Sequence, residues 1–193
     1  MDPKTRKRRA AILRYARKIH RTTGAILFAF FFIVAVTGLL LGWKKHTGGA
    51  ILADTAKGKS ANPEDWLPLP VLRDSAQAAF RNQISSELSP AIDRIDVRPD
   101  KGIAKFIFVE NYWGIQMDLT TGEPLSVERR RSDFIENVHD AVILDNLLGT
   151  SSEQIKLVYT SVMGLALLTF TITGVWLWLG PKQFKSRRTG YPK

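Results

Sequence analysis

The sequence predicts an α+β membrane protein. Its expected architecture is a two-helix transmembrane hairpin with an extracytoplasmic domain, in which one helix packs on a three- to four-stranded antiparallel sheet. Three observations predict it. Residues 22–43 and 157–180 contain no charged side chain. The net charge of +10 on the 193 residues is concentrated beside these two stretches. Between them, apolar residues at helical spacing are followed by short β-rich segments separated by turn residues.

Each uncharged stretch is long enough to cross a bilayer, because a helix rises about 1.5 Å per residue and roughly 20 apolar residues span the hydrocarbon. We expect the first transmembrane helix over residues 22–43. It is interpreted as an uncleaved signal anchor, since its apolar run is longer than the hydrophobic region of a signal peptide, which has roughly 7 to 15 residues. The second is expected over residues 150–180. Thr150 and Glu153 fit a capping box at its start, and Gly180-Pro181 is expected to stop it.

The distribution of charge predicts an orientation. Residues 1–22 carry a net +8, residues 181–193 carry +5, and residues 44–156 carry −3. By the positive-inside rule, the basic segments 1–21 and 181–193 belong in the cytoplasm and residues 44–156 on the other side. In a bacterium this places the protein in the inner membrane and residues 44–156 in the periplasm. The expected partner of the basic segments is the lipid bilayer rather than nucleic acid.

The middle region is expected to form one small domain. Residues 44–65, which contain three glycines, read as a tether. Residues 66–131 form the domain itself: a helix that follows Pro68 and Pro70 and ends near Leu88, then strands around residues 92–97, 104–109, 113–119 and 125–127. Residues 132–149 are expected to form an amphipathic helix along the membrane surface.

Composition excludes several kinds of chemistry. The chain has no cysteine, which excludes disulfides, thiolate metal sites, covalently attached haem and a cysteine nucleophile. Neither uncharged stretch, 22–43 or 157–180, contains Asp, Glu, Lys, Arg or His, which argues against an ion or proton pathway. No hydrolase, phosphate-loop or zinc motif is present. We therefore expect no catalytic residue and no metal-ion site, and an enzyme is the less favoured reading.

Three segments resemble the PepSY-associated transmembrane family. They are the opening and close of the first span (His20-Arg21-Thr22-Thr23-Gly24 and Thr37-Gly38-Leu39), the strand and turn of residues 115–123, and the close of the second span (Thr173-Gly174-Val175-Trp176-Leu177-Trp178). The resemblance implies a bacterial inner-membrane protein whose residues 66–131 form a periplasmic PepSY-like module. Larger members have four or more spans and are associated with siderophore-iron reduction and haem binding. This chain differs in having two spans and one module.

The three histidines are the candidate cofactor ligands. His20 and His46 bracket the first span and would lie about 39 Å apart along a continuous helix, so they cannot share one ligand group within a monomer. His46 and His139 are predicted on the same side and can converge as axial ligands of haem b, with Asp140 or Glu136 orienting His139. In a dimer, His20 from two chains can form a second site. The alternative is that all three are ordinary interfacial or solvated histidines.

Small residues mark possible packing faces of the spans. Gly38 and Gly42 form a GxxxG motif, and Gly164 and Gly174 lie on one side of the second span. These faces can pack the two helices together, hold a homodimer or larger complex, or seat a porphyrin.

Two functional hypotheses follow. In the first, the chain is a membrane-anchored PepSY-like module that binds or regulates an envelope partner. In the second, it is a haem b-binding redox accessory in iron, siderophore or haem handling. If it is an enzyme, the second hypothesis makes it a component of a haem-dependent membrane oxidoreductase.

Overall fold

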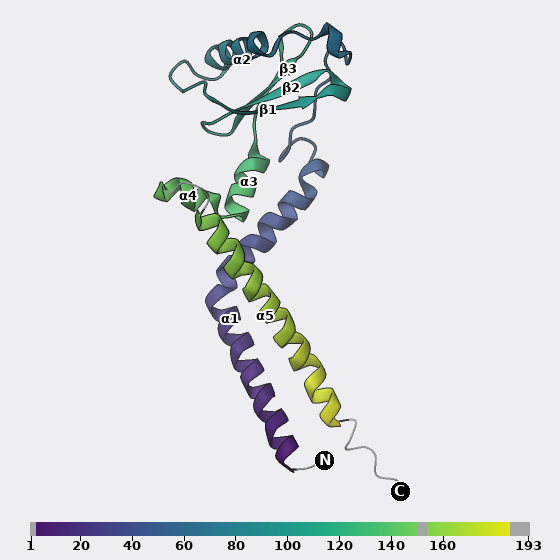
Figure 1. Cartoon of the computed structure of the whole chain (residues 1–193), viewed down its shortest axis with the longest axis vertical. Helices are drawn as coiled ribbons and strands as arrows, with labels where there is room; N and C mark the ends of the chain where they lie inside the picture. Colours follow the sequence, from purple (N-terminus) through teal and green to yellow (C-terminus); the bar gives the residue numbers. More distant parts are fainter. Residues whose placement is uncertain (1–2, 150–153, 186–193) are drawn as a thin grey trace. The chain divides into compact units, whose positions relative to one another are not determined.

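The computed structural model describes residues 3–149 and 154–185, which divide into two compact units. One comprises Met1–Gly38 with Val138–Lys193, and the other Leu39–Asn137. The second unit contains a four-stranded antiparallel meander in the order β1-β2-β3-β4. The strands are β1 (Ile92–Arg98), β2 (Ile103–Phe108), β3 (Trp113–Asp118) and β4 (Pro124–Arg129). Helix α2 (Leu69–Gln83) lies on one face of this sheet (Figure 1), which confirms the predicted α+β class.

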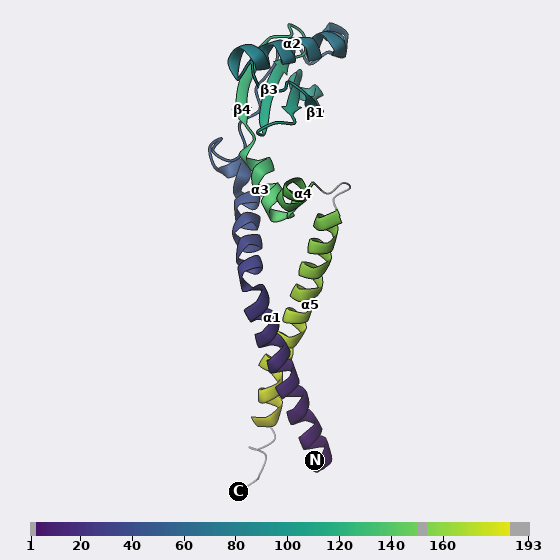
Figure 2. The same ribbon diagram turned by 90° about the vertical axis from the view of Figure 1, so that its left-hand side faces the viewer.

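Helix α2 lies across the sheet (Figure 2), and apolar side chains from both form the core of this unit. Phe80 of α2 is fully buried, and its ring centroid lies 4.4 Å from that of Phe108 on β2. Around this pair, α2 contributes a stripe at helical spacing and the strands contribute alternate residues: Leu72, Ala76, Ala79, Ala104, Phe106, Ile115 and Met117. The helix ends at Gln83, five residues before the predicted end, because the chain turns toward β1 after the last buried contact.

The opposite face of the sheet is covered by the irregular segment 51–60. Its backbone bonds to strand side chains: Ala56 N donates to Gln116 Oε1 at 2.9 Å, and Lys59 N donates to Asp118 Oδ2 at 2.8 Å. Gly58 and Gly102 approach so closely here that a Cβ on either would collide with opposing backbone, and Gly102 also has a φ of +65°. The segment expected as a tether therefore also completes the sheet domain.

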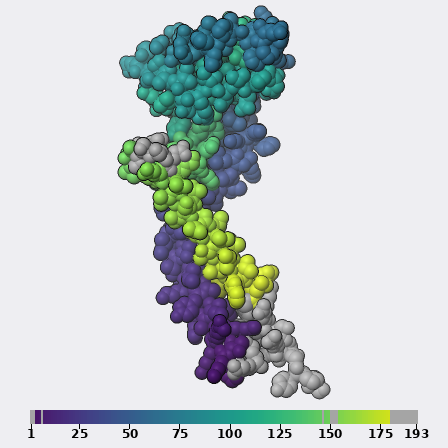
Figure 3. Space-filling model, viewed as in Figure 1, coloured from purple at the N-terminus to yellow at the C-terminus, as the bar shows by residue number. Residues whose placement is uncertain are grey.

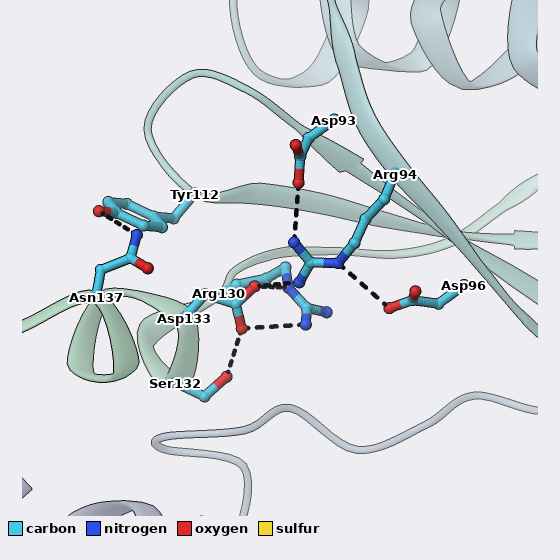
Figure 4. A network of polar contacts seen from close by, with 8 residues as sticks. All are labelled: Asp93, Arg94, Asp96, Tyr112, Arg130, Ser132, Asp133 and Asn137. Atoms are coloured by element: carbon cyan, nitrogen blue, oxygen red, sulfur yellow. Dashed lines mark hydrogen bonds and ion pairs between the residues drawn. The ribbon is translucent and has the colours of Figure 1, made fainter. Parts of the chain in front are cut away.

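A polar network fixes the start of α3 (Arg131–His139) to the sheet (Figure 4). Asp133 accepts from Arg130 Nε at 2.7 Å and from Arg94 of β1 at 2.8 Å. Burial alone would raise the pKa of the Asp133 carboxyl, but its hydrogen bonds and charge interactions, chiefly with Arg130 and then Arg94, hold that pKa below its ordinary value. Asn137, one turn further along α3, donates to the Tyr112 hydroxyl at 3.1 Å.

The two long helices of the chain are α1 (Pro3–Trp43) and α5 (Gln154–Lys185). Both contain windows long and apolar enough to cross a membrane, with mean hydropathies of 2.6 and 1.9. Large apolar side chains are exposed along both, such as Phe28 at 70% and Leu165 at 67%, as expected of surfaces that face lipid. Residues 3–38 of α1 lie against α5 in the space-filling view (Figure 3).

Two predicted features of the long helices differ from the structure. Helix α1 begins at Pro3, so the basic segment continues the transmembrane helix rather than preceding it. Helix α5 continues to Lys185 past Gly180-Pro181, because proline removes one helical hydrogen bond without preventing further turns. The predicted cap residues Thr150 and Glu153 lie outside the described residues.

The single helix expected over residues 132–149 is two helices, α3 and α4 (Val142–Leu148). Between them Ala141 adopts a left-handed φ of +59°, which ends α3. After the break, Asp145 of α4 contacts the start of α5. Its carboxylate accepts hydrogen bonds from the backbone N–H groups of Ile155 and Lys156 at 3.1 and 2.9 Å. A carboxylate at a helix N-terminus satisfies unpaired N–H groups and complements the helix dipole. Shorter 3-10 helices occur at Lys44–His46, Pro63–Asp65 and Pro99–Lys101.

Candidate functional site

His139 is held against α1 by a threonine. It is the last residue of α3, and its Nδ1 lies 2.8 Å from Thr37 Oγ1. Thr37 is 8% exposed although it lies in a transmembrane helix. Its hydroxyl also donates to the carbonyl of Ile33, one turn earlier, at 2.6 Å.

His20 is held in the same way by a threonine of the other span. Its Nδ1 lies 3.0 Å from Thr173 Oγ1, and Thr173 is also 8% exposed. The Thr173 hydroxyl donates to the carbonyl of Thr169 at 2.8 Å. The imidazole stacks on Phe170 with ring centroids 3.8 Å apart and an interplanar angle of 27°.

Both threonine contacts are made at Nδ1 of the imidazole. A hydroxyl has one proton, and the hydroxyls of Thr37 and Thr173 each lie within hydrogen-bond distance of a backbone carbonyl one turn earlier. With the proton on that carbonyl, each threonine oxygen is an acceptor that suits a histidine Nδ1–H. In a neutral imidazole this leaves the Nε2 lone pair free, which is the arrangement of a histidine prepared to bind a metal centre through Nε2.

A glycine lies beside each of the two rings. A Cβ on Gly38 would lie 3.6 Å from His139 Cε1, and a Cβ on Gly174 would lie 3.6 Å from His20 Cε1. Each glycine directly follows the threonine that holds the same histidine. The two Thr-Gly pairs therefore contact an imidazole in the same way: the threonine hydroxyl lies at Nδ1 and the glycine lies beside Cε1.

The two histidines form separate sites. His20 lies on α1 seventeen residues before Thr37, which contacts His139. At 1.5 Å per residue, this separation corresponds to about 25 Å along the helix. One chain therefore offers one imidazole near each end of the membrane span.

An apolar cavity of about 870 Å³ lies between α1 and α5 and extends to His139. Most of its walls are aromatic and aliphatic, including Phe28, Phe31, Met163 and Leu167, whereas His139, Asp140 and Tyr159 contribute polar groups. This volume lies within the range of protein sites for cofactor-sized ligands, and apolar walls with few polar groups are typical of such sites.

The remaining candidate residues have other surroundings. His46 belongs to the unit Leu39–Asn137, lies in a 3-10 helix and is exposed. A Cβ on Gly42 or Gly164 would meet no described atom within 4 Å. Asp140 lies 3.8 Å from Lys156, while the hydrogen bond to His139 Nδ1 comes from Thr37. Pairing of His46 with His139 stays a prediction, as does helix packing at the glycines.

Sequence reasoning did not identify Thr37, Thr173 and Phe170 as partners of the histidines. A signal was present, because Thr-Gly pairs recur in the spans: Thr23-Gly24 and Thr37-Gly38 in the first and Thr173-Gly174 in the second. No sequence rule connects a histidine to a threonine 102 or 153 residues away.

Comparison with known proteins agrees with the arrangement of spans and sheet. The family model described as the PepSY-associated TM region matches residues 17–192. This match includes both histidine sites and the whole sheet domain. No curated protein and no solved structure matches the chain.

Proposed function

The chain belongs to the PepSY-associated transmembrane family, and from this premise we propose that it is a membrane protein that binds haem b through His20 and His139. The observation that carries the proposal is the equivalent support of the two histidines. The Nδ1 atom of each lies 3.0 or 2.8 Å from a threonine hydroxyl oxygen, which leaves Nε2 as the ring nitrogen that would bind iron.

The donor set fits haem b. Neutral imidazole nitrogen is a common axial ligand of haem iron, and a hydrogen bond at Nδ1 orients the ring and increases its basicity. The chain has no cysteine for covalent attachment, so the haem would be held by axial ligation and apolar contacts. The aromatic cavity next to His139 supplies such contacts. A haem bound in this way supplies one-electron transfer between ferrous and ferric iron.

Each site contains one histidine held by a threonine. We propose that the second iron ligand would come from another copy of the chain. In a two-fold symmetric dimer whose copies have the same orientation in the membrane, a residue on the axis meets its own equivalent. His20 would then pair with His20 of the second copy, and His139 with His139. The competing arrangement is the pairing of His139 with His46.

The same proposal includes an orientation in the bacterial inner membrane. The charges of residues 1–22 and 181–193 favour the cytoplasm for both ends, with residues 44–156 in the periplasm. His20 would then lie near the cytoplasmic face and His139 near the periplasmic face, a placement suited to a redox accessory in iron or haem handling.

Absorbance spectroscopy tests the proposal. The full chain is purified in mild detergent from cells supplied with a haem precursor, and spectra are recorded before and after dithionite reduction. We expect a Soret band, sharp reduced α and β bands, and about one haem per chain by pyridine haemochrome. His20→Ala and His139→Ala should each remove about half of the haem.

The matched control is His46→Ala, an exposed histidine without a described hydrogen bond. Unchanged haem content in this variant supports pairing between copies, whereas loss equal to that of His139→Ala supports the His46–His139 pair. A colourless protein that takes up no haem would overturn the proposal and leave the hypothesis of an envelope binding module.

A further inference from the structure

A polar cavity of about 300 Å³ lies in the sheet domain, and none of the residues that line it contacts His20 or His139 in a described hydrogen bond. It lies on the sheet face opposite α2, because Lys105 on its wall alternates with Ala104 and Phe106, which pack against α2. Basic residues outnumber acidic ones five to two on its walls: Lys45, Arg98, Lys101, Lys105 and Arg130 against Asp96 and Asp100.

Lys105 is the buried group of this cavity. It lies at the centre of β2, is only 6% exposed, and donates from Nζ to Thr55 Oγ1 at 3.0 Å. No carboxylate among the described residues lies within 4.0 Å of this ammonium. Burial lowers the pKa of Lys105, and the charge of Glu128 opposes this from a distance. Because burial also raises the pKa of Glu128, both groups lack the stabilisation that a close ion pair would give.

The other charges around the cavity do not supply the missing partner. Asp96 faces Lys105 across the β1–β2 pair, but its only described ion pair is a 3.9 Å contact with Arg94. Arg130 is neutralised by Asp133. Lys45, Arg98 and Lys101 have no ion pair with a described residue. A buried ammonium among unpaired cations is expensive in free energy unless an anion is bound.

The cavity wall includes a residue close in sequence to the end of α1. Lys45 lies two residues after Trp43, where α1 ends, and Trp43 is 69% exposed. Tryptophan at the end of a span is typical of the interface at the level of lipid headgroups. The chemistry available at that level and complementary to ammonium and guanidinium groups is the phosphate group.

We propose that this cavity binds a phosphate group, with Lys105 Nζ as its buried anchor and Arg98 and Lys101 as additional donors. The phosphate comes either from an anionic lipid headgroup or from a small soluble phosphate. Neither source involves the histidine sites, so the proposal is independent of haem binding.

The test compares binding of two probes by the full chain in nanodiscs. The lipid arm compares phosphatidylcholine discs with and without phosphatidylglycerol, and retained lipid is measured by native mass spectrometry. The soluble arm titrates inorganic phosphate into the phosphatidylcholine discs and follows the thermal midpoint. Lys105→Met keeps the length of the side chain without its charge and should weaken binding tenfold or more in the arm that is positive for the wild type. Lys57→Met, an exposed lysine of the covering segment, is the matched control.

Binding of phosphatidylglycerol alone identifies a lipid headgroup, and binding of inorganic phosphate identifies a soluble ligand; both support the proposal when Lys105→Met abolishes them. If Lys105→Met fails to fold, Lys101→Met and Arg98→Gln, which change rim residues, serve instead and should each weaken binding several-fold. The proposal is overturned if the wild type responds to neither probe, or if the cavity variants respond like Lys57→Met.

Discussion

Thr37 Oγ1 lies 2.8 Å from His139 Nδ1 while its hydroxyl donates to the carbonyl of Ile33 in α1. One short side chain therefore occupies the Nδ1 side of the imidazole and leaves Nε2 without this contact. Thr173 does the same for His20. Because the two threonines use identical chemistry, their removal should have matching consequences.

We expect Thr37→Val and Thr173→Val to weaken haem binding at their own sites by about 10- to 100-fold, because loss of an acceptor that orients an axial histidine has effects of this size. The measurement is a haem titration followed at the Soret band. Thr171→Val is the matched control, because Thr171 is exposed in the same helix and also donates one turn back, to Leu167. Equal effects of all three variants would contradict an orienting role for Thr37 and Thr173.

The packing around His20 predicts a contrast between two alanine substitutions. A Cβ on Gly24 would lie 3.0 Å from Phe170, the ring that stacks on His20. A Cβ on Gly174 would lie at an ordinary 3.6 Å from His20 itself. Gly24→Ala should therefore displace the Phe170 ring and destabilise the chain by about 1 kcal/mol, whereas Gly174→Ala should be tolerated.

Thermal unfolding in detergent measures this contrast, and electron paramagnetic resonance of the oxidised haem reports whether the His20 ring has moved. We expect altered g values for Gly24→Ala only. A larger effect of Gly174→Ala would mean that the stack between Phe170 and His20 does not control the position of the imidazole.

The α+β class and the two spans could be predicted because they depend on local patterns. Runs of uncharged residues identify α1 and α5. Alternation of apolar and polar residues, bounded by turn residues, identifies the strands. The break at Ala141 could not be predicted, since the apolar pattern continues across it, and the contact that α4 makes after the break, from Asp145 to the start of α5, is tertiary. The same holds for the site: the histidines are visible in the sequence, but their threonine partners lie more than 100 residues away.

Asp133 makes the sheet domain sensitive to acid. Its pKa is lower in the folded chain than the ordinary value of 3.8. The stability that it contributes is therefore complete above that ordinary value and is lost as pH falls through the folded pKa. At neutral pH, Asp133→Asn should cost about 2 kcal/mol, because it leaves Arg94 and Arg130 without a charged acceptor.

Hydrogen exchange of the amides in β1 and α3, measured from pH 7 down to pH 3, checks this prediction. Faster exchange in Asp133→Asn should be clear at pH 7 and should shrink toward the acid end. Asp74→Asn is the control, since its ion pair with Arg73 is exposed and should contribute little. A difference between wild type and Asp133→Asn that does not depend on pH would contradict the assignment.

The proposed orientation predicts which parts of the chain a membrane-impermeant reagent can reach. Because the sequence contains no cysteine, a single introduced thiol reports one position without background. Ser86→Cys, exposed after α2, should react with an impermeant maleimide in intact spheroplasts. Thr5→Cys, exposed near the start of α1, should react only after the membrane is permeabilised. The opposite pattern would place the basic ends outside, and His139 rather than His20 would then lie toward the cytoplasm.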